Sequence, residues 1–114
     1  MGYRRVRADQ VPAAPGPHPA ASAYDRGIGE ALGVSAFGLY QVELPPGETT
    51  VLHDHVDDRA QDAYVILSGH GVVVADGDEV AVAPGDFIAI DAESRRQVRA
   101  AADGLTFIAV CASP

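Results

Sequence analysis

Two histidines separated by one residue, His53 and His55, have the type and spacing to hold a metal ion. In an extended strand their side chains point to one face, about 6.5–7 Å apart along the backbone, and two imidazoles leaning together can bind one divalent cation. A carboxylate could join them. We expect Asp62, at the start of the next apolar segment, because Asp57 and Asp58 fall in a predicted turn. An acidic, solvent-exposed loop without metal is the alternative interpretation.

Short segments of strand-like composition surround the histidine pair, separated by turns rich in Gly, Pro and Asp. They cover residues 36–44, 49–55, 63–68, 72–75, 79–83, 87–90, 96–100 and 105–110. Short strands at this spacing predict an all-β sandwich or barrel. The one helix candidate, residues 27–33, is too short to alter that fold class.

The chain begins with a segment of different composition. Residues 11–20 contain four prolines, which disfavour both helix and central strand. We therefore predict an N-terminal arm or linker over residues 1–20 and a barrel domain over residues 21–114. Residues 1–8 would form a short strand or a frayed end, and His18, within the proline-rich part, is expected to be solvated.

Length and charge exclude several classes of protein. The chain has 114 residues and a formal net charge of −8, so it forms one domain, and its dispersed arginines argue against nucleic-acid binding. Apolar runs are much shorter than the roughly 20 residues that span a membrane, and no signal-like segment is visible. We expect a cytoplasmic protein, in which the single cysteine, Cys111, is a small buried side chain.

The histidine segment resembles the first conserved motif of the cupins, a family of small jelly-roll β-barrels. That motif reads glycine, five residues, His-x-His, three or four residues, glutamate, six residues, glycine. Gly47, His53, His55 and Gly69 are in register, with Asp62 at the place of the glutamate. The resemblance covers about residues 37–110. It implies a single-domain jelly-roll barrel of six to eight strands and, as is common for small cupins, a homodimer.

The sequence departs from the cupin pattern at two places. Asp62 is one methylene shorter than glutamate and follows the histidine pair after a gap of six residues. The second cupin motif has proline, glycine and histidine at fixed distances from its first glycine. Counted from Gly85, this chain has Asp91, Glu93 and Arg96 at those places. The fourth metal ligand of the family is therefore missing.

Arg96 allows two interpretations. A guanidinium stays protonated and repels a divalent cation, so it could pair with Asp62 and brace a metal-free barrel. It could instead bind a carboxylate or phosphate at the barrel mouth, in a pocket that includes Tyr64. Adjacent strand residues face opposite sides, and a one-residue bulge would exchange the sides of Arg96 and Gln97. The alternation of side chains therefore does not decide which of the two points inward.

Three functions follow from these residues. In the first, His53, His55 and Asp62 hold iron, manganese, nickel, copper or zinc, with open positions for a small organic molecule. In the second, a metal-free barrel binds a small anionic or aromatic ligand through Tyr64 and Arg96. In the third, the domain serves only dimerisation or partner binding. We favour the first, because buried imidazoles without partners would cost about 1–3 kcal/mol per unsatisfied group.

Overall fold

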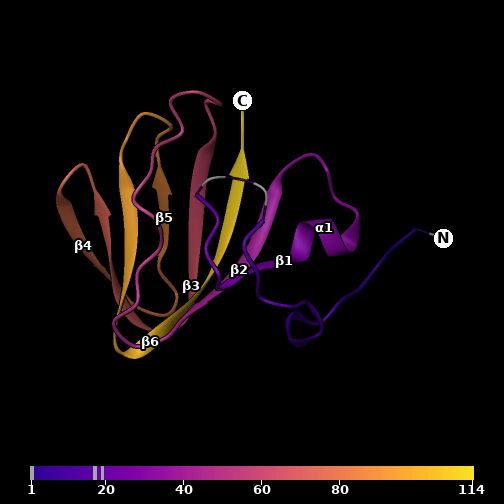
Figure 1. Ribbon diagram of the computed structural model, residues 1–114, viewed down its shortest axis with the longest axis horizontal. Helices are drawn as coiled ribbons and strands as arrows, with labels where there is room; N and C mark the ends of the chain where they lie inside the picture. The colour runs from indigo at the N-terminus through magenta and orange to yellow at the C-terminus, as the bar shows by residue number, and fades with distance from the viewer. Residues whose placement is uncertain (1, 17, 19) are drawn as a thin grey trace.

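A computed structural model describes residues 2–16, 18 and 20–114 (Figure 1). Two short helical elements lie near the start, the 3-10 helix η1 (Ala8–Gln10) and α1 (Ile28–Leu32). The strands are β1 (Asp25–Gly27), β2 (Gly38–Leu44), β3 (Gln61–Ala75), β4 (Asp78–Val82), β5 (Phe87–Ile90) and β6 (Arg96–Ala112). The predicted all-β class is confirmed, and the helix candidate at residues 27–33 forms α1.

The two longest strands, β3 and β6, pair antiparallel along almost their whole length and divide the sheet into two halves. In one half, the start of β3 pairs with β5 and with the end of β6, which continues to β2 and β1. In the other half, the end of β3 pairs with β4 and with the start of β6. Figure 1 shows the sheet curling around its interior.

The turn expected at residues 69–71 is instead a bend within β3. The β3–β6 register shifts between Ile66 and Ser68 and again between Gly69 and Gly71. Gly69 has a φ of 76°, and a Cβ there would overlap the carbonyl of Gly104. This glycine therefore lets two strands bend together and enter both halves of the barrel.

The strand expected at residues 49–55 forms only isolated bridges. Thr49 pairs with Arg99, and His53 pairs with Arg96. Between them the backbone N–H of Val98 donates to the Thr50 side chain instead of a backbone carbonyl. The segment runs extended along the edge of β6, which is enough to place His53 and His55 beside the barrel interior.

The hydrophobic core fills the space between the two sheet halves. Alternation along β3 turns Tyr64 and Ile66 inward, and Phe107 of β6 packs with Tyr64 at a ring-centroid distance of 5.1 Å. The remaining buried members of this cluster are Val42, Leu44, Val73, Val82, Ile90, Val98, Ala100, Leu105. Burying these side chains supplies the main favourable free energy of folding.

The described part of the N-terminal arm is tied to β1. Arg26 donates to the carbonyls of Val11 at 2.6 Å and Ala8 at 3.2 Å, and the N–H of Ala14 donates to the carbonyl of Asp25 at 2.9 Å. Val11 is buried. The arm thus lies against the barrel although it adds no regular strand, and the domain boundary after residue 20 stays a prediction.

Residues 2–7 have no regular secondary structure, so the short strand, one of the two alternatives for residues 1–8, is not seen in the part of the chain that the structure describes. Within the same part, neither helix is long and apolar enough to cross a membrane.

Candidate metal centre

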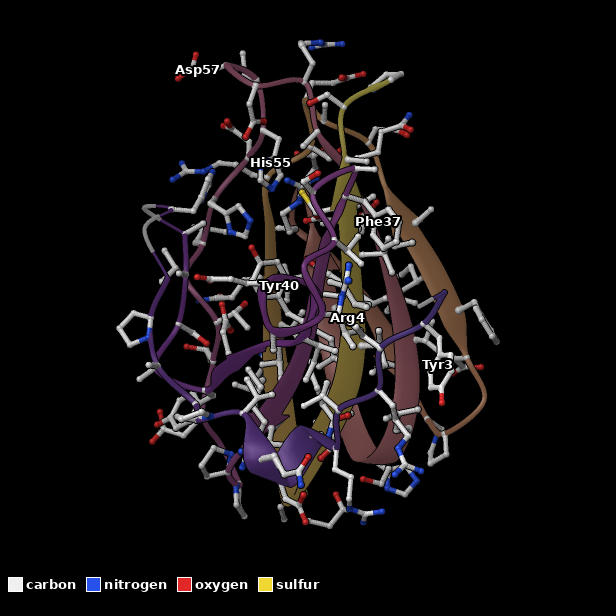
Figure 2. The ribbon with its side chains drawn as sticks, turned by 90° about the vertical axis from the view of Figure 1, so that its right-hand side faces the viewer. Tyr3, Arg4, Phe37, Tyr40, His55 and Asp57 are labelled. Carbon is white, nitrogen blue, oxygen red and sulfur yellow. The ribbon has the colours of Figure 1, made fainter. Side chains whose placement is uncertain are left out.

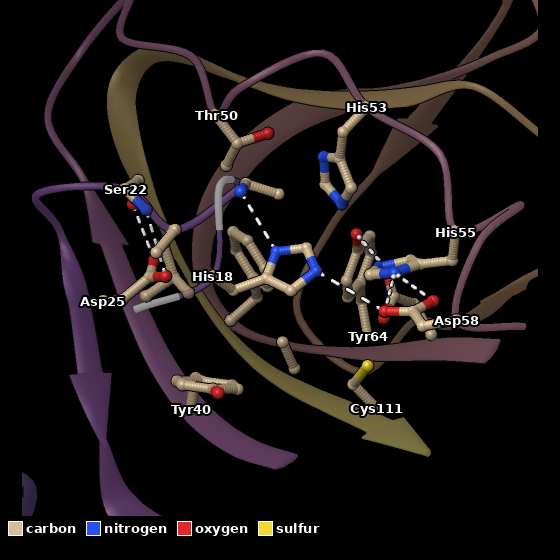
Figure 3. A pocket seen from close by; sticks show the side chains of 16 residues that line it. His18, Ser22, Asp25, Tyr40, Thr50, His53, His55, Asp58, Tyr64 and Cys111 are labelled. Carbon is tan, nitrogen blue, oxygen red and sulfur yellow. Dashed lines mark hydrogen bonds and ion pairs between the residues drawn. The ribbon is translucent and has the colours of Figure 1, made fainter. Parts of the chain in front are cut away.

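A pocket of about 150 Å³ opens into the barrel beside the histidine pair (Figure 3). The polar part of its lining comes from the arm, the edge segment, the turn at residues 56–58 and β3: His18, His53, His55, Asp58, Asp62. The apolar or aromatic part comes from β2, β3 and β6: Tyr40, Val42, Tyr64, Phe107, Ala109. A small apolar chamber with polar groups at one side is the usual form of a ligand site.

His53 and His55 lean together as their spacing predicts. Their ring centroids lie 5.0 Å apart, with the rings perpendicular. The backbone of His53 exchanges two hydrogen bonds with Arg96, and the N–H of His55 donates to the carbonyl of Ala92 at 2.8 Å. Because the main chain is held at both positions, the two rings are positioned by the fold and not by each other.

Hydrogen bonds to Nδ1 determine which ring nitrogen is free. His53 Nδ1 lies 2.7 Å from the carbonyl of Val51, which can only accept, so this nitrogen carries the proton. His55 Nδ1 lies 3.0 Å from the carboxylate of Asp58, which likewise accepts. In the neutral form of each ring Nε2 then keeps its lone pair, as in metal-binding histidines whose other nitrogen is held by a carbonyl or carboxylate.

Asp62 completes the group at the start of β3. Its Oδ2 lies 3.5 Å from Nε2 of His55 and accepts a hydrogen bond from the Tyr64 hydroxyl at 3.1 Å. One ligand atom from each of His53, His55 and Asp62 lies within 4.8 Å of the others. Histidine nitrogens and a carboxylate at these separations can hold a divalent cation.

A local turn explains how Asp62 reaches the pair despite the long gap. Residues 56–58 form a turn, and the N–H of Arg59 donates to the carbonyl of His55 at 2.8 Å. Arg59 has a φ of 60°, which folds the extra residues outward before β3 begins. Asp57 lies exposed at the tip of this turn and points outward, away from His55 (Figure 2).

Burial favours the neutral form of His53. Its partial desolvation lowers its pKa, against the opposing effect of the hydrogen bond to Val51. The nearby charge of Arg96 lowers this pKa further. A neutral imidazole is the form that binds metal.

Arg96 points inward, which resolves the choice between it and Gln97. It has no exposed surface, and its Nη1 lies 3.8 Å from Oδ2 of Asp62, so the predicted ion pair forms. Nη2 donates to the carbonyl of Asp91 at 2.6 Å, whereas Nε and Nη1 have no hydrogen-bond partner among the described residues. The guanidinium therefore lies buried beneath Asp62, outside the lining given above.

Tyr64 does line the pocket, where burial raises the pKa of its hydroxyl far above the usual value. The hydroxyl is therefore a fixed donor to Asp62. Cys111 lies across the strand pair from Asp62, and burial together with that carboxylate raises the pKa of its thiol to about 12. The thiol therefore stays protonated. Cys111 is half-buried and not fully buried as expected.

Sequence reasoning missed two residues of this pocket, His18 and Asp58. His18 is exposed, as expected, but its ring also lies 5.4 Å from that of His55 (Figure 3), a contact that the sequence did not indicate. Asp58 was assigned to a turn, where it lies, without its contact to His55. The i, i+3 spacing of His55 and Asp58 was a usable signal for the second contact. Nothing in the sequence pattern indicated the contact between His18 and His55.

Comparison with known proteins identifies the family. A model of the cupin domain family matches residues 40–112, which is more than half of the chain. A search of curated proteins found no match. Many solved structures match the fold.

Among these structures is a cupin-superfamily sugar phosphate isomerase from Silicibacter pomeroyi, with a TM-score of 0.80 and 24% identity, covering 97% of this chain and 76% of that one. A cupin protein from Bacteroides fragilis has a TM-score of 0.76 and 22% identity, covering 99% and 86%. A predicted oxalate decarboxylase from Thermotoga maritima has a TM-score of 0.66 and 27% identity, covering 75% and 74%. The chain belongs to the cupin domain family and has its jelly-roll fold.

Proposed function

We propose that this cupin binds a divalent metal ion through Nε2 of His53, Nε2 of His55 and the carboxylate of Asp62. The observation that carries the proposal is the pair of Nδ1 hydrogen bonds, to the Val51 carbonyl and the Asp58 carboxylate, which leave both Nε2 atoms as acceptors. For the buried His55, an acceptor lone pair without a partner is costly unless something uses it.

The donor set suits several ions. Imidazole and carboxylate ligands bind zinc, iron, manganese, nickel and copper, and three protein ligands leave coordination positions open. A bound ion would supply Lewis acidity toward a small organic molecule in the pocket. The apolar wall that includes Val42 and Phe107 would exclude water from that molecule. Relatives named as a sugar phosphate isomerase and a predicted oxalate decarboxylase agree with an enzyme acting on small molecules.

Arg96 supports a second candidate, a metal-free barrel that binds a small molecule. Its guanidinium already balances the charge of Asp62, as a metal ion would do. In this case Asp62 and Arg96 would be a structural brace, and ligand binding would depend on the pocket wall around Tyr64. Chelators would leave such binding unchanged.

The test is the metal content of protein purified without chelator or affinity tag, measured by elemental mass spectrometry. We expect about one equivalent of a transition metal per chain, lost in the His53→Ala/His55→Ala double variant. His70→Ala is the matched control, because His70 is exposed and hydrogen-bonded to Asp103 outside this pocket. Wild-type protein that stays metal-free after reconstitution would refute the first candidate and leave the second.

A further inference from the structure

Asp58 joins the predicted metal ligand His55 to the N-terminal arm. One oxygen of its carboxylate accepts from Nδ1 of His55 at 3.0 Å and from the N–H of Ala60 at 3.1 Å. The other oxygen lies 3.4 Å from Nε2 of His18 in the arm (Figure 3). A single carboxylate thus contacts both a residue of the site and a residue of a separate chain segment.

The tautomer of His18 follows from its other hydrogen bond. The backbone N–H of Ala20 donates to His18 Nδ1 at 3.0 Å, so Nδ1 is the acceptor and the neutral ring carries its proton on Nε2. That proton faces the Asp58 carboxylate. His18 in this position has no lone pair on Nε2 for a metal, although His18, His55 and Asp58 are close enough together to be considered as a ligand group.

The same reasoning orders the three groups. His18 presents an N–H to Asp58, Asp58 receives a second N–H from His55, and His55 is left with its Nε2 lone pair on the side of Asp62. Figure 3 shows the rings of His18, His53 and His55 grouped at the pocket, with Asp58 next to His55. Asp58 is therefore a positioning residue for His55, and His18 positions Asp58.

The contact also determines how the arm is held. Arg26 fixes the earlier part of the arm through the carbonyl of Val11, and Ser22, after the arm, is hydrogen-bonded to Asp25. Between these two anchors, His18 is the described arm residue whose side chain contacts the pocket's polar side. Docking of this stretch therefore depends on where the Asp58 carboxylate lies.

We propose that docking of the N-terminal arm and metal binding at His53, His55 and Asp62 are coupled through Asp58. This proposal rests on the proposed metal site. An arm held by His18 keeps Asp58 in place to fix the tautomer and orientation of His55, which favours the metal-bound form. By linkage, metal binding must then favour the docked arm by the same factor.

The first experiment measures Zn²⁺ affinity by chelator competition for single variants of the full chain. We expect Asp58→Asn to weaken Zn²⁺ binding about tenfold or more, as is typical for the loss of a carboxylate that holds a metal-binding histidine. His18→Ala should weaken it about fivefold. His18→Gln should recover most of that loss, because a glutamine amide can also donate to Asp58.

Two matched controls separate coupling from general damage. His70 and Asp103 form a similar exposed histidine–aspartate contact of 2.7 Å outside the pocket. His70→Ala and Asp103→Asn should leave Zn²⁺ affinity unchanged. Circular dichroism and thermal unfolding confirm that each variant is folded before its affinity is compared.

The second experiment measures the reciprocal effect by hydrogen exchange at the amides of Ala20 and Ala21, which donate to Nδ1 and to the carbonyl of His18. Saturating Zn²⁺ should slow their exchange in the wild type by about the factor that His18→Ala costs in affinity. In Asp58→Asn, Zn²⁺ should leave their exchange unchanged.

Zinc X-ray absorption distinguishes coupling from direct ligation, since the count of imidazole ligands should be two in both the wild type and His18→Ala. Three imidazoles in the wild type, or equal affinity and unchanged arm exchange across the variants, would overturn the coupling while leaving the metal site intact. Zn²⁺ binding that survives in His53→Ala/His55→Ala, or is absent from the wild type, would overturn the proposed function as well.

Discussion

Two paired segments beside the pocket have opposite electrostatic character. The edge segment at residues 49–55 brings two imidazoles, the side chains of His53 and His55, which in their neutral form can bind a cation. Its bridge partner at the start of β6 brings Arg96, a permanent cation with no exposed surface. Asp62 lies against both, 3.5 Å from His55 and 3.8 Å from Arg96. The same carboxylate can therefore balance a buried arginine or share its charge with a metal ion.

The comparison shows that the two histidines of the first cupin motif can keep their positions although Arg96 stands where the second motif has a histidine. The bridge between His53 and Arg96 is made by backbone atoms, so this pairing does not itself require a particular side chain at position 96. What the change alters is charge. A cation about 4 Å from a ligand carboxylate weakens the attraction of that carboxylate for a metal.

Arg96→Met is expected to have the largest effect on stability and on Zn²⁺ affinity, because it removes the buried cation beside Asp62. Loss of the guanidinium leaves Asp62 buried without a counter-charge, which should lower the free energy of unfolding of the metal-free protein by about 3–5 kcal/mol. Zn²⁺ affinity should rise about tenfold or more, and added metal should restore part of the lost stability. Chemical denaturation with and without Zn²⁺ measures both.

Arg95→Met is the control for that change, because Arg95 is the exposed neighbour of Arg96. It should alter neither stability nor affinity by a comparable amount. Equal Zn²⁺ affinity in Arg96→Met and the wild type would show that the arginine does not oppose metal binding.

Tyr64→Phe is expected to have a smaller effect on the same carboxylate. The hydroxyl donates to Oδ2 of Asp62 in a buried setting, and losing a hydrogen bond to a charged group should cost about 1.5–3 kcal/mol of stability. Zn²⁺ should narrow the difference from wild type, because a metal would satisfy the oxygen that loses its donor. Thermal unfolding of Tyr64→Phe and Tyr40→Phe, two tyrosines of one pocket, gives the measurement. A larger loss for Tyr40→Phe would contradict the role given to Tyr64.

Asp103→Asn is expected to have the smallest effect on stability. It changes the exposed His70–Asp103 contact, which serves as a reference for the buried pair of Asp62 and Arg96. The hydrogen bond from His70 lowers the pKa of Asp103. A lowered pKa in the folded state means that the pair stabilises the fold above the pKa of the unfolded aspartate, about 3.9, and that this contribution fades as the pH falls through the folded value. The melting temperatures of wild type and variant should therefore differ slightly near pH 6 and converge in strong acid. A gap that widens on acidification would contradict the assignment.

Much of the fold follows from local patterns. The motif predicted a glycine at position 69. Its positive φ and its close approach to Gly104 explain why a residue with a side chain would not fit there. Alternation correctly put His53 and His55 on one face. The same patterns divided β3 and β6 into four shorter segments, because a glycine that bends a strand and a glycine that ends one have the same local sequence signal.

The site was less accessible to sequence reasoning. Asp62 was chosen for its place at the start of a strand, and the turn at residues 56–58 shows why the longer gap is tolerated. The direction of Arg96 depends on strand register, which a bulge can reverse, so parity did not decide it. The contact between His18 and Asp58 joins residues 40 positions apart through the path of the arm, and no periodic pattern carries that information.

The central claim is that His53, His55 and Asp62 hold a metal ion above a buried Arg96. Anomalous X-ray diffraction from crystals grown with Zn²⁺, recorded above the zinc absorption edge, tests it most directly. We predict an anomalous peak within bonding distance of Nε2 of both histidines and of the Asp62 carboxylate, about 2.0–2.2 Å from each, with Arg96 still buried. Zn²⁺ bound only elsewhere, or crystals without an anomalous peak in this pocket, would contradict the claim.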